Sequence, residues 1–128
     1  MNKKQEKSTL SVLYVKPGEY PKMIEIEDSL KMMQKLVNGP IEQLMPFDDD
    51  VAIICNDEGK ITGEKPNRTI RTDNDKIVDI IFGNFFICYA PIESEKYLSL
   101  PENLAKKYKE KFKYPEDFEE LSSMLSSL

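Results

Sequence analysis

Hydrophobic and polar residues alternate near the start of the chain, and this pattern predicts an opening β-hairpin. Residues 10–16 alternate and end at Pro17-Gly18, and a second short strand-like run covers residues 23–26. The pattern then changes to helical spacing, with apolar side chains at Leu30, Met33, Leu36 and Val37. Asp28 or Ser29 can cap this helix, and Gly39-Pro40 should end it.

Short apolar runs dominate the middle of the chain and predict further strands. They cover residues 41–47, 51–55, 77–82 and 84–90. Asp57-Glu58-Gly59 supplies turn residues after the second run, so the stretch from Asn56 to Gly63 is interpreted as the loop of a hairpin. Gly83 separates the last two runs and predicts a bulge, a tight bend or a close backbone approach.

The last third of the chain is typical of helices. Leu104, Tyr108 and Phe112 form an apolar stripe, and Ser99 and Glu102 have the spacing of a capping box around Pro101. After Pro115 an acidic amphipathic segment follows. We therefore expect a disordered tail over residues 1–9, one α+β domain over 10–113 with a mainly antiparallel sheet of about five or six strands, and an acidic amphipathic helix over 114–128.

Length and charge narrow the classes of function. A chain of 128 residues is one domain with a self-sufficient core. Its net charge of −5, from 23 acidic and 18 basic residues, argues against a general attraction to DNA or RNA and favours a basic partner. No apolar run is long enough for a membrane span, and the polar start lacks a secretory signal, so we expect a cytoplasmic protein without membrane contact.

The residue types in the sequence argue against an enzyme. The chain has no histidine, which removes the commonest general base and histidine-based zinc sites. Cys55 and Cys88 lie in apolar runs and are interpreted as buried hydrophobes, with a cross-strand bridge as the alternative. Glu42 and Asp79 lie in or beside apolar segments, but no spacing pairs them into an acid–base site. We expect no cofactor, no metal and no enzymatic activity.

Two binding hypotheses remain open. In one, carboxylates form a negative face that binds a basic host protein such as a nuclease, and sequence assigns this role to Asp48, Asp49, Asp50, Asp57, Glu58, Glu116, Asp117, Glu119 and Glu120. In the other, a small anionic ligand such as a nucleotide binds near the Asn56–Gly63 loop. The candidate ligand-binding residues are then Asn56, Lys60, Asn67, Arg68 and Arg71. The protein could be a monomer or a homodimer.

The order of several features resembles a family of small bacterial domains of unknown function. The likeness rests on Lys16-Pro17-Gly18, Val37-Asn38-Gly39, Ile41-Glu42, the stretch from Cys55 to Lys60, Asn67-Arg68, and Ile80 to Ile87. It covers roughly residues 10–112, while the connection from Arg68 to Ile77 is longer here and the acidic C-terminal segment lies outside it. Members of that family occur largely on phages, plasmids and conjugative elements. The resemblance therefore implies an accessory, anti-defence role in a mobile element, with a host nuclease or CRISPR effector as the expected target, and it brings no assigned reaction.

Overall fold

Two antiparallel sheets and two helices make up the described part of the protein. The computed structural model describes residues 8–120. The elements in chain order are β1 (Thr9–Val15), β2 (Lys22–Glu27), α1 (Leu30–Val37), β3 (Ile41–Leu44), β4 (Val51–Asn56), β5 (Pro66–Arg71), β6 (Ile77–Phe82), β7 (Phe85–Tyr89) and α2 (Glu102–Lys111). Five strands form one sheet in the order β2-β1-β7-β4-β3, and β5 pairs with β6 in the second sheet. The α+β class and the antiparallel pairing are confirmed.

The predicted ends of the chain lie largely outside the described residues. Of the tail expected over residues 1–9, only 8 and 9 are described, and Thr9 already belongs to β1. Of the C-terminal helix expected over 114–128, residues 114–120 are described, and 118–120 have helical backbone. Asp117 begins this turn, because its carboxylate accepts hydrogen bonds from the backbone N–H groups of Glu119 and Glu120, each at 3.1 Å.

The opening hairpin and the first helix form as the pattern predicts. β1 pairs with β2 from Thr9 opposite Glu27 to Tyr14 opposite Lys22. Ser29 caps α1, since its hydroxyl accepts a hydrogen bond from the Met32 backbone N–H at 3.1 Å. The helix ends at Asn38, which adopts the left-handed conformation (φ 65°), and the Gly39 N–H closes the turn on the Gln34 carbonyl at 3.0 Å.

The predicted hairpin around Asn56–Gly63 is wrong. The chain does turn locally, since the Gly59 N–H donates to the Asn56 carbonyl at 3.3 Å. However, β4 is already flanked by β3 and β7, so its two edges are occupied. The next strand, β5, therefore leaves this sheet and pairs with β6 alone. The Asn56–Gly63 segment is a connection between two sheets.

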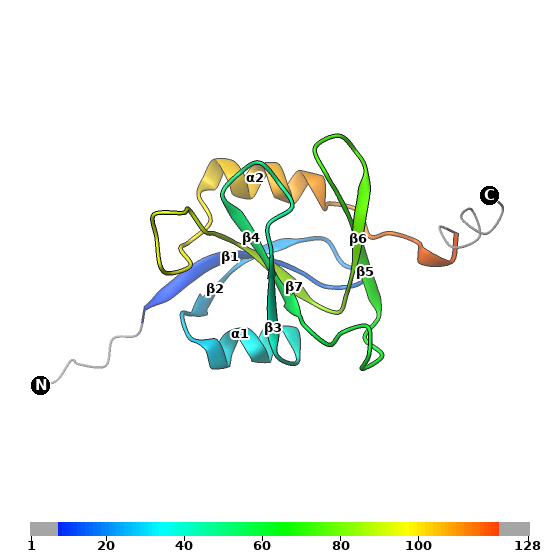
Figure 1. Cartoon of the computed structure of the whole chain (residues 1–128), viewed down its shortest axis with the longest axis horizontal. Helices are drawn as coiled ribbons and strands as arrows, with labels where there is room; N and C mark the ends of the chain where they lie inside the picture. The colour runs from blue at the N-terminus through cyan, green and yellow to red at the C-terminus, as the bar shows by residue number, and fades with distance from the viewer. Residues whose placement is uncertain (1–7, 121–128) are drawn as a thin grey trace, which may run out of the picture.

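Each face of the five-stranded sheet carries its own hydrophobic core. Val12, Ile54 and Phe86 point to the face that α1 covers with Met33 and Val37. The alternate residues of these strands, among them Leu13, Ile53 and Ile87, point to the other face. There the β5–β6 pair contributes Ile70 and Ile81 to the core, and α2 with its C-cap contributes Tyr108 and Phe112. Figure 1 shows α1 and α2 on opposite sides of the sheet, with β5 and β6 beside one end of it.

The start of α2 differs from the sequence prediction. The apolar stripe of Leu104, Tyr108 and Phe112 packs on the sheet as expected. The capping box does not form, because Pro101 occupies the N-cap position and no side chain caps the helix there. The Ser99 hydroxyl instead accepts a hydrogen bond from the Ser11 backbone N–H at 2.8 Å, which ties the segment before α2 to β1.

Candidate functional site

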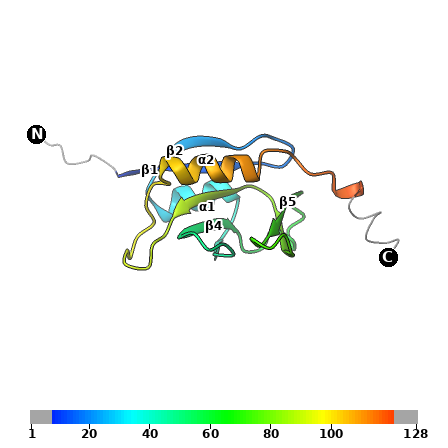
Figure 2. The same ribbon diagram turned by 90° about the horizontal axis from the view of Figure 1, so that it is seen from above.

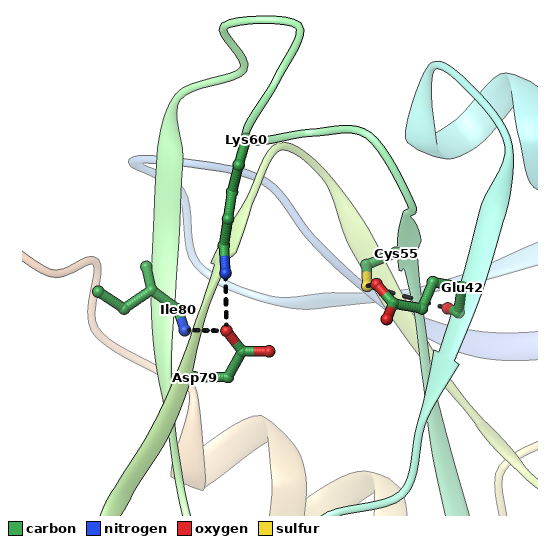
Figure 3. A network of polar contacts seen from close by, with 5 residues as sticks. All are labelled: Glu42, Cys55, Lys60, Asp79 and Ile80. Atoms are coloured by element: carbon green, nitrogen blue, oxygen red, sulfur yellow. Dashed lines mark hydrogen bonds and ion pairs between the residues drawn. The ribbon is translucent and has the colours of Figure 1, made fainter.

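A cleft of about 250 Å³ opens where the edge of the large sheet meets β6. Glu42 of β3 and Cys55 of β4 form one wall, Asp79 of β6 forms the other, and Asp57 and Lys60 come from the connection that follows β4. Figure 3 shows four of these side chains, with Lys60 extended towards Asp79. The crossing of the chain from one sheet to the other therefore creates this cleft.

Lys60 and Asp79 form the principal ion pair of the cleft. The Lys60 ammonium lies 3.0 Å from Asp79 Oδ1, and the Ile80 backbone N–H donates to the same oxygen at 2.8 Å. Both side chains remain open to solvent, with exposed fractions of 61% and 36%. An ion pair this exposed contributes little to stability, at most about 1 kcal/mol, so it can be broken or rearranged by a ligand.

Cys55 lies beneath the carboxylates of the cleft and is held as a thiol. Its Sγ lies 3.8 Å from the Glu42 carbonyl oxygen and 4.0 Å from Glu42 Oε1. Burial is the main cause that raises the pKa of Cys55 to about 12; the negative charges of Glu42, Asp79 and Asp57 contribute to this rise and Lys60 opposes it. A thiol with this pKa is a weak nucleophile at neutral pH.

We expect both cysteines to resist alkylation while the protein is folded. Burial raises the pKa of Cys88 to about 12 as well, and the two thiols lie on opposite faces of the sheet, which rules out the predicted alternative of a bridge between them. Iodoacetamide at pH 8 should label neither thiol in the native protein and both in denaturant, as measured by intact mass. Labelling of Cys55 alone in the native protein would show that the cleft opens to its floor.

Negative charge predominates in the cleft. Three carboxylates (Glu42, Asp57 and Asp79) and one ammonium (Lys60) line it. Glu42 and Asp57 are exposed, and Asp79 is partly exposed. Opposite charges attract more strongly in a concave site than on an open surface, because the protein walls exclude part of the solvent. The geometry therefore suits a cationic group such as a lysine or arginine side chain.

Two of the predicted ligand-binding residues are enclosed by the protein. Arg68 is 0% exposed, and its guanidinium donates to the carbonyls of Phe112 (3.1 and 3.0 Å), Glu19 (2.6 Å) and Asn67 (3.2 Å) and to Asn67 Oδ1 (2.8 Å). Asn67 is 1% exposed, and its amide donates to the carbonyls of Val15 and Gly83. This corrects the expectation that Arg68 faces an anion, since every guanidinium nitrogen already has a protein acceptor.

The other three predicted ligand-binding residues do not form one anion site. Asn56 and Lys60 line the cleft, but the Asn56 amide donates to the Val37 and Asn38 carbonyls, each at 3.1 Å, and so supports the end of α1. Arg71 lies at the far end of β5, where its guanidinium is 3.5 Å from Asp75. Lys60 alone therefore keeps a ligand-facing position.

The predicted acidic residues are spread over separate places. Asp48, Asp49 and Asp50 precede β4, whereas Asp57 and Glu58 follow it, so the two groups lie at opposite ends of one strand. Asp49 Oδ2 accepts hydrogen bonds from the Lys107 ammonium at 2.6 Å and from the Tyr108 hydroxyl at 2.7 Å, and these bonds lower the pKa of Asp49. Glu116 is also occupied, because its carboxylate accepts from the Thr69 hydroxyl at 2.8 Å and from the Thr69 backbone N–H at 3.1 Å. Asp117 caps the turn that contains Glu119 and Glu120.

Glu42 and Asp79 are the site residues whose proximity the sequence did not reveal. They are 37 positions apart, on strands that belong to different sheets. Only the departure of β5 from the first sheet brings β6 to this edge. Within residues 8–120, no cluster of three metal-ligating side chains is present. No helix there has the length and apolar character that a membrane crossing needs.

The comparisons with known proteins place the chain in a family. The family model described as "Domain of unknown function (DUF3846)" matches residues 9–113. No curated protein and no solved structure matches the chain. The matched region runs from the start of β1 to just beyond α2, so it contains both sheets and all the residues that line the cleft. The chain therefore belongs to the DUF3846 family of domains of unknown function.

Proposed function

We propose that the protein is a non-enzymatic binding protein that recognises another protein through a basic side chain inserted into the acidic cleft. The observation that carries this proposal is the excess of carboxylates there, with Glu42, Asp57 and Asp79 against Lys60 alone. Because Asp79 pairs with an exposed lysine, an incoming lysine or arginine can replace that lysine without leaving a buried charge unpaired.

The class of partner follows from the chemistry of the cleft. A protein that binds nucleic acid carries a surface rich in lysine and arginine, and complementary charge accelerates its association with an acidic site. A host nuclease or CRISPR effector fits this description. The mobile-element association that the family resemblance implies favours such a target, and inhibition would follow if the bound protein covers the surface that holds nucleic acid.

The alternative of a small anionic ligand receives less support. Its main cation, Arg68, is enclosed, and the cleft that remains is acidic. A phosphate there would meet three carboxylates and one ammonium, and like charges close together are unfavourable. We therefore retain only the protein-binding proposal.

Neutralising the cleft should abolish capture of the partner. Glu42→Gln and Asp79→Asn together remove two negative charges while keeping similar shapes. Affinity capture from a host lysate, followed by mass spectrometry, should recover a basic protein with the wild type at low salt and lose it with the double variant. High salt should also release it, because exposed charge–charge contacts are screened.

The matched control removes the same charge elsewhere. Glu93→Gln and Glu95→Gln alter exposed carboxylates in the connection after β7, none of which lines the cleft. This control should capture the same protein as the wild type. If the Glu42–Asp79 variant still retains the partner, or if the control loses it equally, the cleft is not the binding site.

A further inference from the structure

The lysines of α2 divide into two groups that face different parts of the molecule. Lys107 pairs with Asp49, and the Lys111 ammonium lies 5.0 Å from the centre of the Phe47 ring, so both turn towards the connection between β3 and β4. Lys106, Lys109 and Lys113 follow each other at three- and four-residue intervals, which places them along one side of the helix and its end. This second group borders the connection between β1 and β2.

The second group of lysines lines a shallow depression with aromatic and apolar neighbours. Its volume is about 310 Å³, and Tyr20, Pro21 and Glu110 complete its lining. The ion pairs of residues 8–120 involve Lys60, Arg71 and Lys107, and none involves Lys106, Lys109 or Lys113. Three lysines against one glutamate therefore give this depression a positive charge, although the chain as a whole is acidic.

Two tyrosines are displayed beside these lysines. Tyr20 is 63% exposed and Tyr114 is 65% exposed, and their ring centres are 6.2 Å apart in an edge-to-face arrangement. The Lys113 ammonium lies 5.4 Å from the centre of the Tyr114 ring. Covering a large aromatic side chain is favourable, so a tyrosine pair left open next to lysines that form no ion pair within residues 8–120 is available to a planar anionic ligand.

Arg68 connects the two segments that carry the tyrosines. Its guanidinium binds the carbonyl of Glu19, next to Tyr20, and the carbonyl of Phe112, two residues before Tyr114. Figures 1 and 2 both show the end of α2 beside the β1–β2 connection. One buried side chain thus fixes the relative position of both segments, and a binding surface that is already ordered loses less entropy when it binds.

We propose that Tyr20, Tyr114, Lys106, Lys109 and Lys113 form a binding surface for single-stranded nucleic acid. Unpaired bases stack on the exposed tyrosine rings, and the lysines contact the phosphates that lie between those bases. The backbone of α2 rises about 8 Å from Lys106 to Lys111, and Lys113 lies beyond the end of the helix, so the three lysines suit a short run of nucleic-acid backbone rather than one phosphate. A duplex fits less well because its bases are already stacked and paired. None of these residues lines the acidic cleft, so this inference does not rest on the proposed function.

Fluorescence anisotropy with the full chain and labelled oligothymidylate or oligouridylate tests this surface. Tyr114→Ala should weaken binding about 10-fold or more, since stacking on an aromatic ring contributes roughly 1–3 kcal/mol per base. Tyr114→Phe keeps the ring and should retain binding. With three phosphate contacts, raising the salt from 50 to 200 mM should lower the affinity about 20-fold. Binding of either oligomer supports the proposal, and a difference between the two would reflect the 2′-hydroxyl or the methyl group of thymine.

Charge-matched variants separate this surface from general electrostatics. Lys109→Gln with Lys113→Gln should weaken binding strongly, whereas Lys31→Gln with Lys35→Gln removes the same charge from α1, on the opposite side of the sheet, and should leave it unchanged. All these side chains are at least partly exposed, and unchanged melting temperatures will show that the variants fold. The proposal is overturned if neither oligomer binds at low salt, if the α1 variant loses as much affinity, or if polyglutamate or duplex DNA competes as well as the single strand.

Discussion

Arg68→Ala is expected to lower the free energy of unfolding by about 3–5 kcal/mol, a large share of the stability of a small domain. The substitution leaves the carbonyls of Phe112 and Glu19 without their donor and opens a void, because Arg68 is among the largest fully buried side chains. Each buried polar group that loses its partner costs about 1–3 kcal/mol. Urea denaturation followed by circular dichroism measures the change.

The chain supplies its own control, because it has only two arginines and they lie three positions apart. Arg71 is 39% exposed in its side chain and pairs with an exposed aspartate at 3.5 Å. Arg71→Ala should therefore cost less than about 1 kcal/mol. Arg68→Lys keeps the charge but cannot bind both carbonyls with a planar fork, so it should recover only part of the loss. Equal effects of Arg68→Ala and Arg71→Ala would contradict a structural role for Arg68.

The burial of Arg68 shows why sequence reasoning misjudged it. An arginine after Asn67, in a stretch rich in turn residues, has the composition of an exposed ligand-binding loop. The position is instead inside β5, whose central residues are all buried between the large sheet and the C-terminal segment. Only the tertiary arrangement brings Phe112 and Glu19, 44 and 49 residues away in sequence, within reach of its guanidinium. No local pattern carries that information.

Local patterns predicted most of the elements, but they did not predict β5, because residues 66–71 contain no apolar run. The first hairpin, α1 with its Ser29 cap and the stripe of α2 follow from side-chain periodicity, which depends on neighbours a few residues apart. Gly83 also matches its predicted role, since it has a positive φ of 86° and its carbonyl accepts from Asn67. The prediction of strand pairing was wrong where the pairing is not local: residues 51–55 were expected to form a hairpin through the Asn56–Gly63 loop, but β4 and β5 belong to different sheets.

The candidate site depends on the same non-local step. Lys60 and Asp57 were identifiable as turn residues with exposed charge, and the structure places both at the cleft. Glu42 and Asp79 could be noticed only as carboxylates beside apolar runs. Glu42 and Asp79 line the same cleft only because β6 lies against the edge formed by β3 and β4. The packing of Ile81 into the core of the large sheet holds β6 in that position.

Asn67 provides the polar connection between the two sheets. It lies on β5, and its amide donates to the carbonyls of Val15 (3.0 Å), at the end of β1, and of Gly83 (2.8 Å), between β6 and β7. Its side-chain oxygen accepts from Arg68 at 2.8 Å. One amide thus joins the second sheet to the first and orients the arginine, since both of its donor hydrogens and its oxygen are paired inside the protein.

Asn67→Leu should therefore destabilise the protein by about 2–4 kcal/mol, although leucine has a similar size, because two carbonyls lose their donor and the Arg68 guanidinium loses one of its acceptors. The loss of stability should differ between the two sheets. Hydrogen exchange is expected to accelerate more in β5 and β6 than in β1, β4 and β7, since the connection between the sheets weakens first. Combined with Arg68→Ala, the effect should be less than additive because the two side chains share one network. Uniform acceleration or full additivity would show that the sheets are held together by apolar packing alone; an early opening of β6 would instead identify Asn67 as the residue that keeps Asp79 in the cleft.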